Sequence, residues 1–110
     1  MSVTTLPAPV AAYLEAKQAH DSDALLAALT EDAVITDEGN EYRGSDAIRA
    51  WNEKASKAVG ATYAVEDVAA VADRTVVAVE VAGDFPGSPV TLYFHFALRD
   101  DRIASLTILG

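Results

Sequence analysis

Four side chains of this 110-residue chain combine useful chemistry with a placement that would let them act on a small molecule. Tyr13 and Trp51 lie in expected helices, Asp37 directly follows a short β-prone run, and His95 lies in a long alternating run. A carboxylate removes protons, and a tyrosine hydroxyl donates a hydrogen bond to negative charge as it develops. Side chains of these types favour proton transfer that needs no cofactor.

Other kinds of catalytic site have no support in the sequence. The chain contains none of the glycine-rich phosphate or dinucleotide motifs, no HExxH zinc motif and no GxSxG nucleophile motif. It has no cysteine, and its two histidines, His20 and His95, are far apart. We therefore expect no metal site and no cofactor.

Length and charge limit the class of protein and its partners. A chain of 110 residues, 51% of them hydrophobic, is expected to form one domain over residues 1–110. The 8 basic and 17 acidic residues give a net charge of −9, which repels nucleic acid and anionic membranes. The first ten residues do not form a signal peptide, and no run approaches the roughly 20 apolar residues of a membrane span. We expect a cytoplasmic protein with neither nucleic acid nor membrane as partner.

The order of elements predicts an α+β fold. Apolar spacing and capping residues predict helices near 8–20, from Asp21 or Ser22 through Leu29, and from Ser45 to Gly60. One strand is expected at 33–36, ending at Asp37 before a turn, and four more near 62–72, 75–83, 90–99 and 103–109. Short connections predict antiparallel neighbours, so we expect three helices packed on a bent antiparallel sheet in the order α-α-β-α-β-β-β-β.

Alternation within the strands separates two faces of the sheet. The residues expected between helices and sheet are Ile35, Ile48, Trp51, Val77, Val79, Val81, Phe94 and Phe96, and the third helix adds Ala55 and Val59. The opposite face carries Val76, Ala78, Tyr93, His95 and Ala97. This second face is too apolar for water, and we expect it to form a homodimer.

Several segments carry a resemblance to a known family. They are Glu31 to Asp37, Tyr42 to Trp51 with its Ala-Ile-x-x-Trp pattern, Phe94-His95-Phe96, and Asp100-Asp101-Arg102-Ile103. Over essentially its whole length the chain resembles the SnoaL-like group of the nuclear transport factor 2 superfamily. The resemblance implies a cone-shaped fold, a curved sheet wrapped by helices around an apolar pocket, and commonly a dimer through the sheet. It implies no single activity, because the fold hosts isomerases, cyclases, dehydratases, hydrolases and non-catalytic modules.

Within that group, the ketosteroid isomerases supply a pattern for the site. They use a tyrosine of the first helix as an oxyanion donor, an aspartate after the first strand as the base, and a protonated aspartate in a late strand as second donor. Tyr13 and Asp37 match the first two positions. The third falls near Phe94, where this chain has no carboxylate, which leaves Tyr93, Asn52 or His95 as possible substitutes.

The sequence leaves two functions open. One is a ligand-binding isomerase or cyclase that moves a proton on a hydrophobic carbonyl compound, with Asp37 as base, Tyr13 as donor, and a binding site formed by Ile35, Trp51, Asn52, Val79, Phe94 and His95. The other is a non-catalytic ligand-binding or dimeric scaffold module with a solid interior. Asp37 would then be a solvated turn residue, Tyr13 and Trp51 core aromatics, and His95 a structural residue of the outer face.

Overall fold

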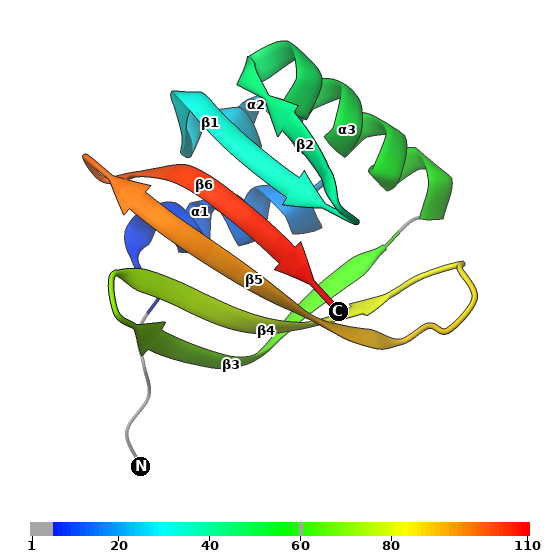
Figure 1. Ribbon diagram of the computed structural model, residues 1–110. Helices are drawn as coiled ribbons and strands as arrows, with labels where there is room; N and C mark the ends of the chain where they lie inside the picture. Colours follow the sequence, from blue (N-terminus) through cyan, green and yellow to red (C-terminus); the bar gives the residue numbers. More distant parts are fainter. Residues whose placement is uncertain (1–5, 60) are drawn as a thin grey trace.

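The computed structural model describes residues 6–59 and 61–110, with only the backbone described for residues 55–59. The elements are α1 (Ala8–Gln18), α2 (Ser22–Ala27), β1 (Leu29–Asp37), β2 (Asn40–Arg43), α3 (Gly44–Val59), β3 (Thr62–Val71), β4 (Arg74–Ala82), β5 (Val90–Arg99) and β6 (Arg102–Leu109). The helices cover one face of a six-stranded sheet (Figure 1). The predicted α+β class with three helices on a curved sheet is confirmed.

The sheet is mixed, so the prediction of a wholly antiparallel sheet is wrong in one pair. The strand order is β2-β1-β6-β5-β4-β3, and β1 and β6 run parallel whereas every other neighbouring pair is antiparallel. Short connections predict only the pairing of consecutive strands. More than 60 residues separate β1 from β6 in the sequence, and that length of chain permits a parallel pair.

Strand β2 is a second correction, because the sequence predicts only a turn at that point. Glu38 (φ 53°) and Gly39 (φ 78°) both have positive φ, as a two-residue type I′ hairpin requires. Asp37 therefore pairs with Asn40, and the chain returns along β1. The segment Asn40–Arg43 contains a single strongly β-prone residue, Tyr42, and tertiary pairing overrides its low propensity.

The two N-terminal helices follow the predicted hairpin with small shifts at their ends. Helix α1 ends two residues earlier than predicted, and Leu29 begins β1 rather than ending the second helix. The Asp21 carboxylate caps α2 by accepting a hydrogen bond from the Ala24 N–H at 3.1 Å. This cap fixes the turn between the two helices.

The core between helices and sheet contains all eight residues predicted to line it. Ile35, Val77, Val79 and Phe96 are fully buried, and Trp51 is the most exposed of the eight at 8%. The side chains of Ala55 and Val59, predicted for the same stripe, and residue 60 lie outside the described residues. Within the described ranges, no helix has the length and apolarity needed to span a membrane.

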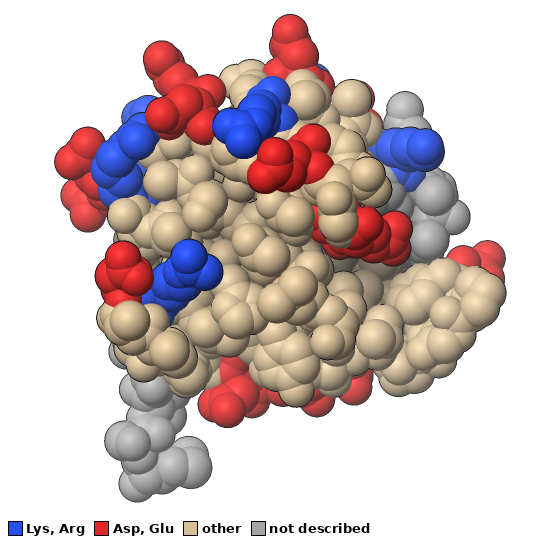
Figure 2. All heavy atoms as spheres, viewed as in Figure 1, with Lys and Arg blue, Asp and Glu red and all other residues tan. Residues whose placement is uncertain are grey.

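The outer face of the sheet carries few charged groups at its centre. Figure 2 views the molecule from this side and shows a broad uncharged area over β5 and β6, with acidic and basic groups around its rim. Tyr93 pairs with Leu109 across this face, and the two are 44% and 50% exposed. His95 and Ala97 alternate with buried Phe94 and Phe96, so they share this face with Tyr93.

Candidate functional site

Asp37 is the last residue of β1 and is held by α3. Its side chain is half-buried, and its Oδ2 accepts a hydrogen bond from the indole Nε1–H of Trp51 at 3.2 Å. Trp51 belongs to the buried stripe of α3, which begins at Gly44 (φ 81°) directly after β2. The hairpin and the helix that follows it therefore position a carboxylate at the edge of the core.

Tyr13 occupies the face of α1 that packs on the sheet. Its ring meets Phe96 and Phe94 edge-on, with centroid distances of 5.5 and 6.5 Å. The side chain is fully buried, and its hydroxyl has no hydrogen-bond partner among the described residues. Burial, with the charges of Tyr63 and Asp37 acting in the same direction, raises the pKa of Tyr13 well above its usual value. Its hydroxyl is thus a neutral buried donor whose pKa the charge of Asp37 also raises.

Lys17 is a further buried polar residue beside Trp51, and the sequence did not predict it as a site residue. It follows Tyr13 by one helical turn, is only 3% exposed, and its Nζ donates to Asn52 Oδ1 at 2.7 Å. The ammonium lies 4.1 Å from the centroid of the Trp51 ring and 5.6 Å from that of Tyr63. Burial lowers the pKa of Lys17 from 10.5 to about 8, although the charge of Asp37 acts in the opposite direction.

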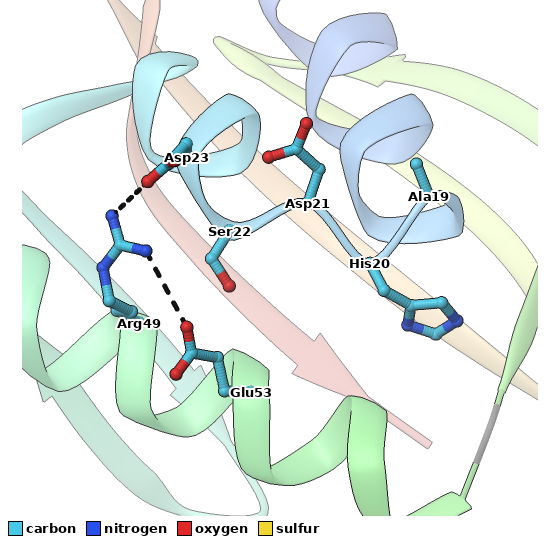
Figure 3. Close-up of a pocket in the computed structure, with 7 residues that line it drawn as sticks. All are labelled: Ala19, His20, Asp21, Ser22, Asp23, Arg49 and Glu53. Carbon is cyan, nitrogen blue, oxygen red and sulfur yellow. Dashed lines mark hydrogen bonds and ion pairs between the residues drawn. The ribbon is translucent and has the colours of Figure 1, made fainter.

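Asn52 links this interior cluster to a second region of the molecule. The Asn52 side chain is 1% exposed, and its Nδ2 donates to Ser22 Oγ at 3.1 Å. Ser22 also lines a hollow of about 690 Å³ between the α1–α2 turn and α3 (Figure 3). In that hollow Arg49 pairs with Asp23 on α2 and with Glu53 on its own helix. Two hydrogen bonds, Lys17 to Asn52 and Asn52 to Ser22, thus connect the Lys17 amine to the lining of this hollow.

The other predicted site residues separate into two groups. Ile35, Val79 and Phe94 are buried in the core, and Phe94 packs beside Tyr13 at the position expected for the second donor of an isomerase. His95 lies on the outer face of the sheet, away from Tyr13. Asp37 and Trp51 thus share a hydrogen bond, and Trp51 and Asn52 both contact Lys17, one turn after Tyr13 on α1. His95 lies apart from them on the outer face.

A surface hollow of about 560 Å³ leads to Asp37 and Trp51. It lies beside the β1–β2 hairpin and α3, and its other lining residues are Glu38, Tyr42, Ala47, Ala50 and Lys54. The Tyr42 and Trp51 rings stack at a tilt in this wall, with their centroids 5.9 Å apart. Aromatic and alanine side chains beside the charged groups of Asp37, Glu38 and Lys54 suit a compound with an apolar body and a polar group.

Chemically, the cluster contains a carboxylate, a buried hydroxyl donor and a buried amine. The carboxylate can accept a proton, the hydroxyl can donate a hydrogen bond, and the amine can act as an acid or a nucleophile. Among the residues that the structure describes, no group of three His, Cys, Asp or Glu side chains is placed to hold a metal ion.

Comparison with known proteins gives one family and a consistent set of folds. The SnoaL-like domain family matches residues 10–106. The structure of the "putative polyketide cyclase" SMa1630 from Sinorhizobium meliloti is similar, with a TM-score of 0.90 and 40% identity over 94% of each chain.

More distant structures share the fold. A protein with a ketosteroid isomerase-like fold from Catenulispora acidiphila, in complex with trimethylamine, has a TM-score of 0.82 at 18% identity over 96% of this chain and 87% of that one. An NTF2-like protein of unknown function from Cytophaga hutchinsonii has a TM-score of 0.77 at 17% identity over 98% and 90%. Nothing among curated proteins matches the chain.

Proposed function

The chain belongs to the SnoaL-like domain family, and from this premise we propose that it binds a hydrophobic carbonyl compound and moves a proton on it without a cofactor. The reaction class is isomerisation or aldol-type cyclisation. The description of the Sinorhizobium meliloti protein as a "putative polyketide cyclase" supports this class. Asp37 is the general base, and Tyr13 is the hydrogen-bond donor.

The observation that carries the proposal is the buried Tyr13 hydroxyl. A buried hydroxyl without a partner destabilises a protein by about 1–3 kcal/mol, so native structures rarely contain one. The same helix places Lys17 against the Trp51 ring. The charge of Asp37 contributes to the raised pKa of the Tyr13 hydroxyl, which has no partner among the described residues. A substrate carbonyl oxygen would supply the missing acceptor.

The proposed reaction uses these two groups in turn. The Asp37 carboxylate removes a proton from the carbon next to the carbonyl, and the electron pair of the broken C–H bond moves onto the carbonyl oxygen. The Tyr13 hydroxyl donates a hydrogen bond to that oxygen as it becomes negative. Asp37 then returns the proton to another carbon, or the enolate carbon attacks a second carbonyl and forms a ring. The apolar residues Phe94 and Trp51 exclude water, which strengthens both interactions.

One observation favours the second candidate, a non-catalytic ligand-binding or scaffold module. Tyr13, Phe94 and Phe96 pack against one another deep in the cone, where an isomerase would place its substrate and second donor. In this alternative, ligands would bind only in the outer hollow at Asp37. The two candidates differ in whether removal of the carboxylate abolishes chemistry or only changes binding.

The test uses cyclohex-3-enone, a small ketone whose double bond moves into conjugation when a proton is transferred. We expect the protein to accelerate formation of cyclohex-2-enone, followed by its ultraviolet absorbance, and Asp37→Asn to slow it roughly 10²–10⁴-fold. Asp73→Asn, in the exposed turn between β3 and β4, removes the same charge and should have no effect. Equal rates for Asp37→Asn and Asp73→Asn would exclude Asp37 as the base.

We also propose that the chain forms a homodimer through the outer face of the sheet. The uncharged centre of that face, with Tyr93 and Leu109 each nearly half exposed, supports it. The site lies on the opposite side of the sheet, so two copies would keep both sites open.

A further inference from the structure

Lys17 is a buried amine for which the proposed proton transfer has no role. Lysine is almost never fully buried unless a carboxylate pairs with it, because burial removes the hydration of its charge. Here the side chain is 3% exposed and lies one turn from the Tyr13 donor, on the same face of α1. Its position needs an explanation beyond packing.

The partners of the Lys17 amine are neutral. Nζ donates to the amide oxygen of Asn52 at 2.7 Å, and the rings of Trp51 and Tyr63 lie at 4.1 and 5.6 Å. In the part of the chain that the structure describes, no carboxylate lies within 4.0 Å of Nζ. The aromatic faces and the neutral amide stabilise the charged amine, but less strongly than a paired carboxylate would.

The electrostatic surroundings agree with this geometry. The groups around the amine are Asn52 and Trp51 from α3, Tyr63 from β3 and the charge of Asp37 from β1. Burial outweighs Asp37 and lowers the pKa of Lys17 to about 8. At pH 7 about 9% of such an amine is uncharged, against about 0.03% of an ordinary lysine, a difference of roughly 300-fold.

We propose that Lys17 is a nucleophile of this site, whose amine forms an imine with the carbonyl compound. The inference rests on the proposed function for the class of compound, since it takes a ketone or aldehyde as the ligand. Trp51 connects the two regions, because its ring packs against Nζ and also lines the hollow that leads to Asp37.

Each step of imine formation balances in atoms and charge. The uncharged amine attacks the carbonyl carbon, its nitrogen loses a proton, and the carbonyl oxygen gains one, which gives a carbinolamine. A proton from the solvent converts the carbinolamine hydroxyl to water, which leaves, and the nitrogen lone pair forms the C=N bond of a positively charged iminium. Hydrolysis reverses both steps and restores the amine, so no oxidant or reductant is required.

The iminium would also assist the proton transfer. A positive nitrogen accepts the electron pair from the adjacent C–H bond as Asp37 removes the proton, and the product is a neutral enamine. The isomerase pattern has a second oxyanion donor at the position that Phe94 fills here. Once the iminium has formed, the carbonyl oxygen has left as water, so this route needs no second oxyanion donor, and the Tyr13 hydroxyl donates to the carbonyl oxygen only before that step.

The test uses pentane-2,4-dione, which condenses with an uncharged amine to give a stable enaminone and water. The protein is incubated with it at pH 7, and the rate of adduct formation at each lysine is measured by peptide mass analysis. We expect Lys17 to react at least about 10-fold faster than exposed Lys54, because its uncharged fraction is larger. The rate at Lys17 should rise with pH with a midpoint near 8.

Two controls make the result decisive. In denaturant the preference for Lys17 should disappear, and Lys17→Arg should lower the rate at which the folded protein gains enaminone absorbance. The main comparison is made within the unaltered chain, so the test stands even if the variant fails to fold. A rate at Lys17 no greater than at Lys54 overturns the inference. Isomerisation of cyclohex-3-enone that still depends on Asp37 would then show that the proposed function itself survives.

Discussion

The candidate site contains two buried polar groups on one face of α1, the Tyr13 hydroxyl and the Lys17 amine. Among the described residues, the Tyr13 hydroxyl has no hydrogen-bond partner and the Lys17 amine has only neutral ones. The charge of Asp37 acts to raise the pKa of both groups. Groups buried in this way lower the free energy of unfolding, and proteins retain them where function requires them. The stability of variants at these positions is therefore informative beside their activity.

Replacing Tyr13 by Phe should lower the activity without lowering the stability. Tyr13→Phe keeps the ring contacts with Phe94 and Phe96 and removes only the unpartnered hydroxyl, so the free energy of unfolding should stay equal or rise by about 1 kcal/mol. Isomerisation of cyclohex-3-enone should slow roughly 10²–10³-fold. Urea unfolding and the rate assay measure the two effects, and Tyr93→Phe on the outer face should change neither. A large loss of stability would mean that the hydroxyl has a structural partner.

Lys17 should make stability depend on pH in the alkaline range. Its pKa is lowered to about 8 in the folded protein and is near 10.5 when unfolded, so the unfolded chain binds more protons between these values. Stability should therefore rise with pH, by about 2 kcal/mol between pH 7 and 9.5 from this group. Above pH 10 the buried Tyr13 acts in the opposite direction, because the unfolded chain then loses tyrosine protons first. Urea unfolding across this range measures the slope.

The control for this slope is a variant without the amine. Lys17→Met should remove the rise, whereas Lys54→Met, at an exposed position, should keep it. A slope that is the same in all three proteins would show that Lys17 is not desolvated in solution.

At the level of single residues, helical spacing predicted that Tyr13 and Trp51 face the core, and both are buried there. The roles of Tyr13 and Asp37 in a site stay a prediction. Lys17 falls on the apolar spacing of the same helix, one turn after Tyr13, and this was the available signal. It was missed because a lysine at the edge of an apolar face usually extends its charge into water.

At the level of elements, the Asp21 cap at the start of α2 stabilises the turn that joins α1 to α2. Helix α2 has only six residues, and the Asp21 carboxylate satisfies its Ala24 N–H. Asp21→Ala should lower the free energy of unfolding by about 1 kcal/mol, whereas Asp21→Asn should keep it nearly unchanged, since asparagine caps equally well. Thermal or urea unfolding distinguishes the two. An equal loss in both variants would assign the effect to the charge instead of the cap.

Helices and late strands were predictable from the sequence because each carries its own periodic pattern. The strands predicted at 62–72, 75–83 and 90–99 agree with β3, β4 and β5 to within a residue at each end. Strand β2 and the parallel pairing of β1 with β6 were not predictable, because each depends on contacts with a distant or weakly β-prone segment. The local pattern of Asn40–Arg43 contains no information about its partner.

For the whole molecule, the outer face of the sheet predicts the oligomeric state. A dimer through this face would bury on the order of 1,600 Å² and sediment as twice the 11.6 kDa chain. Tyr93→Arg places charge at its centre and should give monomers at micromolar concentration. Val65→Arg is the matched control, since Val65 is 46% exposed, against 44% for Tyr93, but pairs with buried Val79 and so lies on the other face. Monomeric unaltered protein would refute the interface.

The central claim is that one bound compound contacts both Tyr13 and Asp37. A crystal structure of the protein with phenol, which resembles the dienol of cyclohexenone in shape and charge, tests it most directly. The account predicts the phenol oxygen within about 3 Å of Tyr13 Oη and a ring carbon within about 3.5 Å of the Asp37 carboxylate. Phenol confined to the outer hollow, with the Tyr13 hydroxyl still without a partner, would contradict the account and favour the non-catalytic module.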